Sequence, residues 1–389
     1  MPVSALPSNA EKAAVWEAFH ARRPTRVPLR WNVNTRIVLL NPDLNPEGID
    51  YETCFHDPII AMRMQARFQE HVATELNIAC DSPVGLPDRW VFHVETQNTY
   101  DAAYFGGRIS FRAGQVPSAD QTYTLADADA FIERAERDRA QPLANPWIKD
   151  RLAYRDRLMA ASADFEYLGR KGIVAPFLIG FDGPLTVATM LFGAEILAAL
   201  MADPDLALRI LTAITEGAIA RNRALSQLAG VPFPGEWAGM ADDSIQLISP
   251  SQYETLILPL HERYYDATGT ARPGEGRRLM HLCGDATRHF PLIRDRLGVV
   301  SFDTGFPVDH GALRDQLGDA IEISGGPHIA LLRDGTPDQC YRRAAEILES
   351  GVKRGGRFIL QEGNNLPPCV PMENLAAVQA ACLEHGGYH

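Results

Sequence analysis

The chain has few basic residues and no long apolar run. Of its 389 residues, 37 are lysine or arginine and 49 are aspartate or glutamate, so the formal net charge is -12. Nucleic acids and anionic membranes attract basic proteins, and this charge disfavours both as partners. No apolar stretch reaches the roughly 18 residues that a membrane span needs, and no basic segment followed by an apolar one begins the chain. We therefore expect a cytoplasmic protein that acts on small molecules or on other proteins.

Cysteine is also scarce, and the chain has no Cys-x-x-Cys pair. The six cysteines are scattered over the sequence: Cys54, Cys80, Cys283, Cys340, Cys369 and Cys382. In a cytoplasmic chain such residues stay reduced, so each serves as packing or as a thiolate. Gly/Ser-rich linkers, internal repeats and low-complexity tracts are missing as well. Because nothing divides the chain, we expect residues 1–389 to form one domain.

Short apolar runs alternate with helix-like stretches, which is typical of βα units around a parallel sheet. Eight such runs are expected to be strands: residues 27–31, 77–80, 173–181, 237–240, 278–281, 299–303, 320–324 and 358–361. Eight parallel strands predict the α/β class and a (β/α)8 TIM barrel.

The helices between these strands have clear signals. Residues 194–201 and 203–228 are expected to be helical, and Ser249 followed by Pro250 forms an N-cap and first-turn pair for another helix. The segment 91–168 does not fit a minimal βα unit, because it contains an apparent hairpin near 104–112 and a charged helical stretch at 126–139. We expect it to be an insertion after the second strand.

Polar side chains follow the predicted strands at the ends where barrel enzymes carry their chemistry. The candidates, in chain order, are Asn34, Arg36, Asp81, Asp182, Asp242, Asp243, His281, Cys283, Asp303, His328, Glu362 and Asn364. If the strands are placed correctly, these side chains converge on one cavity. Asp81 and Asp182 have a second reading as helix N-caps. The adjacent carboxylates Asp242 and Asp243 favour a functional site, since they repel each other unless a cation or donors relieve them.

His281 and Cys283 are the strongest candidates for a metal site. They follow the apolar run at 278–280, and in an extended chain residues i and i+2 point to the same side. Zinc binds an imidazole nitrogen and a thiolate sulfur readily. The alternative is that Cys283 is a small buried apolar residue and His281 a hydrogen-bonded core imidazole.

Several motifs in fixed order resemble the uroporphyrinogen decarboxylase superfamily. They are Gly183-Pro184-Leu185-Thr186-Val187-Ala188, the succession Asp242-Asp243, Ser249-Pro250 and Leu258-Pro259, then His281-Leu282-Cys283-Gly284, Gly335-Thr336-Pro337 and Pro371-Met372-Glu373-Asn374-Leu375. This superfamily consists of (β/α)8 barrels and includes the porphyrinogen decarboxylase and the zinc methyltransferases that act on methylated corrinoid proteins. The resemblance extends from about residue 26 to 388.

The chain resembles the zinc-dependent corrinoid methyltransferase branch more than the decarboxylase itself. The decarboxylase has an arginine-rich signature near its N-terminus, of which one arginine survives in residues 30–36. Asp81 stands where the decarboxylase has its key aspartate, but alone it could not hold an octa-acid substrate. In the methyltransferase branch, His-x-Cys and a distant cysteine bind zinc. Here Asn364 replaces that cysteine, and Glu362 or Cys369 could substitute for it, with Glu362 closer to the strand end.

The resemblance implies a zinc-dependent methyltransferase. Zinc held by His281, Cys283 and Glu362 would activate a thiol, and cobalamin would be carried by a separate corrinoid protein. The expected catalytic carboxylates are Asp81, Asp242 and Asp243, and the expected substrate-binding residues are Asn34, Arg36, Asp182, Asp303, His328 and Asn364. The superfamily's decarboxylases are often dimers, which allows a homodimer here.

Two other functions stay open at this point. In a metal-independent decarboxylase, Asp81 and Arg36 would stabilise charge on a small carboxylated substrate. In a binding or regulatory protein, the barrel would have lost one metal ligand and its catalysis, since barrels of this kind host unrelated functions.

Overall fold

A computed structural model describes residues 7–269 and 277–388. The strands in these residues form three sheets. The largest is parallel, in the order β10-β9-β8-β7-β6: β6 (Ala238–Ala241), β7 (Arg278–Leu282), β8 (Val299–Thr304), β9 (Glu322–Gly325) and β10 (Phe358–Leu360). The second sheet has the order β1-β5-β4: β1 (Trp90–Phe92), β4 (Glu166–Tyr167) and β5 (Arg170–Val174). The third is an antiparallel hairpin of β2 (Arg108–Ser110) and β3 (Ser118–Asp120).

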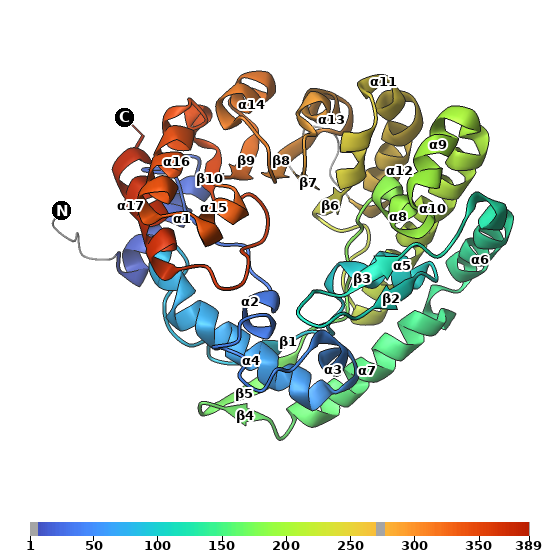
Figure 1. Cartoon of the computed structure of the whole chain (residues 1–389), viewed down its shortest axis with the longest axis horizontal. Helices are drawn as coiled ribbons and strands as arrows, with labels where there is room; N and C mark the ends of the chain where they lie inside the picture. The colour runs from blue at the N-terminus through green and yellow to red at the C-terminus, as the bar shows by residue number, and fades with distance from the viewer. Residues whose placement is uncertain (1–6, 270–276, 389) are drawn as a thin grey trace.

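Backbone hydrogen bonds connect the sheets into a barrel wall, which Figure 1 shows as a ring of elements. Leu29 forms a parallel bridge with Leu360 beside β10. The Asp81 N–H donates to the Leu29 carbonyl at 2.8 Å, and on the other side of the ring the Ala241 N–H donates to the Phe181 carbonyl at 3.0 Å. The predicted strands at 27–31 and 173–181 therefore lie in the wall, although much of their length is irregular.

Side chains, instead of a neighbouring strand, satisfy one edge of β1. Gln65 and Gln69 come from α4 (Pro58–Thr74). Gln69 accepts from the Val91 N–H at 3.0 Å and donates to the Val91 carbonyl at 2.9 Å, and Gln65 forms the same pair with His93 at 2.8 and 2.8 Å. Because unpaired backbone groups are costly when buried, the two amides replace a strand at this position.

The predicted second strand at 77–80 is wrong. Leu76–Ala79 forms a short 3-10 helix, η1, in which the Ile78 N–H donates to the Glu75 carbonyl at 3.1 Å. A four-residue apolar run is too short for its periodicity to distinguish a strand from a helical turn. The segment 91–168 begins inside β1, which was not predicted, and carries the β2–β3 hairpin together with α5 (Tyr100–Tyr104), α6 (Ala128–Ala140) and α7 (Pro146–Ser162).

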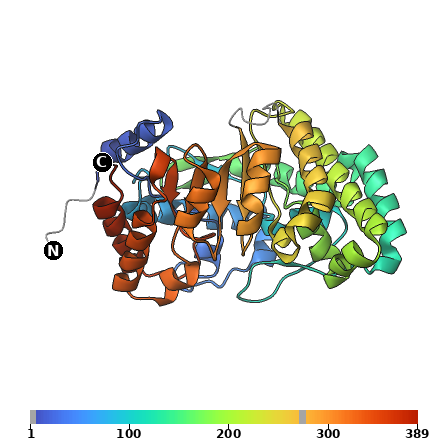
Figure 2. The ribbon, with the colours of Figure 1, turned by 90° about the horizontal axis from the view of Figure 1, so that it is seen from above.

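Helices cover the outside of the barrel wall (Figures 1 and 2). The predicted helices at 194–201 and 203–228 are confirmed as α9 (Ala194–Ala202) and α10 (Pro204–Ala229). Ser249 forms the predicted N-cap of α11 (Pro250–Gln252), with a capping box to Gln252. The other α-helices are α1 (Asn9–His20), α2 (Arg36–Leu39), α3 (Tyr51–His56), α8 (Pro184–Phe192), α12 (Leu258–Thr268), α13 (Phe290–Leu297), α14 (His310–Leu317), α15 (Ile329–Asp334), α16 (Pro337–Glu349) and α17 (Met372–His385).

The two faces of β7 explain how the barrel positions its polar groups. Arg278, Met280 and Leu282 are buried, whereas Leu279 and His281 between them are more exposed. Successive side chains of a strand point to opposite faces. The three buried side chains therefore pack against the surrounding structure, and Leu279 and His281 face the barrel interior. His281 therefore points inward.

Within the described residues, no single helix has both the length and the apolar composition to cross a membrane. Helices α8 and α9 meet that criterion only as a pair, across a bend of 114°.

Candidate metal and substrate site

A cavity of about 590 Å³ lies at the carboxyl ends of β6, β7 and β8. Of the predicted site residues, it is lined by Asp182, Asp243, His281, Cys283, Asp303 and Asn364. Trp31, Asn32 and Asn365, which lie at the ends of predicted strands, also line it. The lining residues that sequence reasoning did not place here are Val33, Asn98, Thr186, Met190 and Ala241. None of these five residues carries a charge or follows a recognisable spacing, so only the folded chain reveals them. The cavity thus joins the ends of strands that are far apart in sequence.

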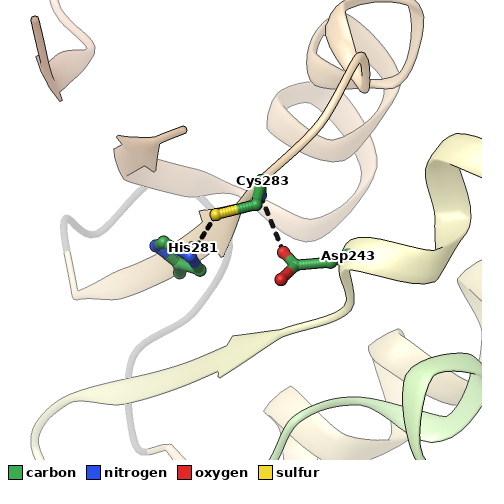
Figure 3. A group of neighbouring side chains, drawn as sticks. All are labelled: Asp243, His281 and Cys283. Atoms are coloured by element: carbon green, nitrogen blue, oxygen red, sulfur yellow. Dashed lines mark hydrogen bonds between the residues drawn. The ribbon is translucent and has the colours of Figure 1, made fainter. Parts of the chain in front are cut away.

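His281, Cys283 and Asp243, which all line this cavity, lie next to one another (Figure 3). His281 Nε2 lies 3.0 Å from Cys283 Sγ, and the Cys283 backbone N–H donates to Asp243 Oδ1 at 2.7 Å. One ligand atom from each residue lies within 4.8 Å of the other two. No other group of three histidine, cysteine or carboxylate donors this close occurs in residues 7–269 and 277–388. The i, i+2 spacing across the end of β7 therefore brings the imidazole and the thiol together as predicted.

Asp303 fixes the orientation of the His281 ring. Its Oδ2 lies 2.8 Å from His281 Nδ1, and its Oδ1 accepts from Gln361 Nε2 at 2.5 Å. A carboxylate on one ring nitrogen sets the tautomer that leaves the other nitrogen available as a ligand. Burial alone would lower the pKa of His281, but hydrogen bonds to Asp303 and Cys283 raise it well above its ordinary value. The arrangement directs Nε2 toward Cys283.

The adjacent carboxylates Asp242 and Asp243 have different environments. Asp242 is fully buried and accepts from the Thr186 N–H at 2.7 Å, from Thr186 Oγ1 at 2.8 Å and from the Leu185 N–H at 3.3 Å. It also lies 2.9 Å from His261 Nε2. These contacts place Asp242 at the N-terminus of α8, where donors compensate its charge. Asp243 faces the cavity, and burial raises its pKa.

Asp182 also lines the cavity, and its backbone contacts a buried ion pair. Its Oδ1 accepts from the Tyr100 hydroxyl at 2.6 Å, and its backbone N–H donates to Asp101 Oδ2 at 2.8 Å. Asp101 in turn pairs with Arg221 at 2.6 Å, and both of these side chains are fully buried. Burial and the neighbouring Asp101 charge raise the pKa of Asp182 to about 7. Within residues 7–269 and 277–388, no lysine or arginine forms an ion pair with Asp182.

Asp81 and Glu362 do not line this cavity. Asp81 forms a two-point ion pair with Arg26 at 2.5 and 2.7 Å and accepts from the Leu29 N–H, which gives it a structural role in the barrel wall. Glu362 is fully buried and accepts from the Asn32 N–H at 3.1 and 3.2 Å. Its pKa is raised well above the ordinary value by burial. Neither Glu362 nor the exposed Cys369 belongs to the group of three donors, whose third member is Asp243.

The remaining candidates lie at the rim or in other cavities. Asn34 accepts from Arg36 Nε at 2.9 Å and donates to Asn365 Oδ1 at 3.3 Å, and it lines a separate cavity of about 340 Å³. His328 accepts the Ala330 N–H as the N-cap of α15 and lines a separate cavity of about 640 Å³ beyond β8 and β9. That cavity is larger but contains none of the three donors.

Comparison with known proteins supports a family assignment. The family model for uroporphyrinogen decarboxylase (URO-D) matches residues 170–385. A methylated-thiol–coenzyme M methyltransferase of Methanosarcina mazei is 29% identical over 215 residues, which is 54% of this chain and 53% of that protein. The methylcobamide:CoM methyltransferase MtbA of Methanosarcina acetivorans is 27% identical over 34% of this chain and 36% of its own length. The matched region therefore spans about half the length of the first relative and about a third of the length of the second.

A solved structure agrees with the fold over nearly the whole chain. A methyltransferase from Methanosarcina mazei superposes with a TM-score of 0.63 and 19% sequence identity, covering 97% of this chain and 98% of the other. This likeness confirms the α/β TIM barrel. The chain belongs to the uroporphyrinogen decarboxylase (URO-D) family, near its corrinoid methyltransferase branch.

Proposed function

We propose that this protein is a cytoplasmic, zinc-dependent methyltransferase. It would move a methyl group between a methylated small molecule or a corrinoid protein and a thiol or corrinoid acceptor. The observation that carries the proposal is the group formed by Asp243, His281 and Cys283, whose ligand atoms lie within 4.8 Å of one another. The names of the curated relatives support methyl transfer as the reaction, and a cobalamin would come from a separate partner protein.

The donor set fits zinc. A nitrogen, a sulfur and a carboxylate oxygen are ligands that zinc accepts, and three protein ligands leave one position for a substrate. When bound, zinc would act as a Lewis acid that lowers the pKa of a substrate thiol. We propose Asp243 as the third ligand in place of Glu362, because Asp243 already contacts the Cys283 backbone at 2.7 Å.

The surrounding residues hold this donor set in position. Asp303 orients the His281 ring through Nδ1, so that Nε2 stays directed toward Cys283. Asp242 anchors the first turn of α8 and keeps its own charge away from the cavity. We propose that Asp182 and Asn364 contact the substrate, since both line the cavity. The decarboxylase alternative has less support, because Asp81 lies outside this cavity and is buried against Arg26.

Metal content of the purified protein tests the proposal. We expect about one zinc per chain in the wild type, loss of zinc in Cys283→Ala and strongly reduced zinc in Asp243→Asn, in which the amide keeps an acceptor for the Cys283 N–H. Glu362→Gln is the matched control and should retain the metal. A folded wild type that stays metal-free after incubation with zinc would refute the proposed mechanism.

A further inference from the structure

We propose that the small-molecule substrate of this cavity carries an ammonium group. This inference rests on the proposed function and adds the chemical class of the substrate. Three carboxylates, Asp182, Asp243 and Asp303, line the cavity, and no lysine or arginine is among its lining residues in the part of the chain that the structure describes. Fields of one sign in a cleft attract ligands of the opposite sign and repel those of the same sign.

The nearby arginines are already bound to other groups. Arg221 stands behind Asp182, where it pairs with Asp101 at 2.6 Å and donates to the Gly180 carbonyl at 2.7 Å. Arg30 donates to Gln361 Oε1 at 2.9 Å, and the amide of Gln361 separates it from Asp303. A third arginine, Arg36, donates to the side chain of Asn34 at 2.9 Å. None of these cations lines the cavity.

The charge balance stays negative when a metal is bound. A divalent cation would be neutralised by the Cys283 thiolate and the Asp243 carboxylate, with His281 neutral. Asp303 then remains, together with Asp182, whose pKa of about 7 leaves it partly ionised at neutral pH. Asp182 keeps one buried oxygen, Oδ2, that has no hydrogen-bond partner among the described residues, while its Oδ1 accepts from Tyr100. An ammonium charge in the cavity would compensate the charge of this carboxyl group through the electrostatic field, without a hydrogen bond to the buried oxygen.

An aromatic residue completes the match. Trp31 lines the same cavity, and its indole N–H is held by the Ala79 carbonyl at 3.1 Å, which fixes the ring in place. Aromatic faces attract ammonium and quaternary ammonium groups, and carboxylates add to that attraction. Coenzyme M, which appears in the names of the curated relatives, is by contrast a thiol with an anionic sulfonate. The cavity of this chain therefore favours a substrate of opposite charge.

Isothermal titration calorimetry with zinc-loaded protein tests the inference. Choline and 3,3-dimethyl-1-butanol have the same shape but differ in charge, and we expect choline to bind about tenfold tighter. Among thiols, 2-aminoethanethiol should bind at least about tenfold tighter than 2-mercaptoethanesulfonate. Asp182→Asn, which keeps the acceptor for Tyr100, should remove most of the preference for choline. The surface variant Asp129→Asn should leave it unchanged.

The outcomes separate this inference from the proposed function. Tighter binding of the sulfonate than of the amine in a zinc-containing protein would overturn the ammonium proposal while leaving the methyltransferase proposal intact. Loss of that sulfonate binding in Arg36→Gln would then assign the cavity to anions. Equal binding of choline and its neutral analogue would also overturn the inference. A protein that takes up no zinc and binds no thiol would instead refute the proposed function.

Discussion

Removing one partner of the buried Asp101–Arg221 ion pair should destabilise the protein strongly. The two groups are 2.6 Å apart and fully buried, and Arg221 also donates to the Gly180 carbonyl. In Arg221→Met, Asp101 would be left as a buried charge beside Asp182, whose backbone N–H it accepts. Breaking a buried pair in this way typically costs about 3–5 kcal/mol, because the remaining charge is desolvated without compensation.

Urea unfolding followed by circular dichroism measures this cost. We expect Arg221→Met to lower the free energy of unfolding by about 3–5 kcal/mol. The double variant Asp101→Asn/Arg221→Met should lose less than the sum of the two single variants, because no unpaired charge remains. A loss below about 1 kcal/mol in Arg221→Met, the range of exposed pairs, would refute the reasoning.

Two further predictions follow from close packing and from burial. In Gly305→Ala a Cβ would lie 2.8 Å from Cys283 Cα and Sγ. Zinc affinity measured by chelator competition should therefore fall about tenfold or more. In the control Gly363→Ala the nearest atom would lie 3.4 Å from the new Cβ, and zinc affinity should stay unchanged. Burial lowers the pKa of His310 to about 4. Since the unfolded chain binds this proton near pH 6.5, stability should fall by up to about 3 kcal/mol as the pH drops from 6.5 to 4. His310→Leu should lose that part of the pH dependence, and an unchanged pH profile would contradict the assignment.

The sequence was sufficient to predict the barrel and the His281–Cys283 pair, because both depend on local periodicity. Alternation along β7 places the two donors on one side whatever the rest of the chain does. The third donor was not predictable in the same way. Glu362 has the right chemistry and lies close to its strand end, but its carboxylate turns to the Asn32 N–H.

Tertiary contacts decide the features that the sequence did not predict. Asp242 and Asp243 look equivalent in sequence. The position of α8 determines that Asp242 binds the helix N-terminus and that Asp243 faces the cavity. Gln65 and Gln69 share a face of α4 through their i, i+4 spacing, but that spacing does not reveal that they pair with the edge of β1. Such contacts depend on how the elements of the barrel meet, which local spacing does not encode.

X-ray absorption at the zinc edge of the metal-loaded protein tests the central claim most directly. The account predicts one sulfur ligand at about 2.3 Å, from Cys283, with nitrogen and oxygen completing the shell. Cys283→Ser should lose the sulfur contribution, and Asp243→Asn should change the light-atom ligands without removing it. Two sulfur ligands in the wild type, or a spectrum unchanged in Cys283→Ser, would contradict a site built from Asp243, His281 and Cys283.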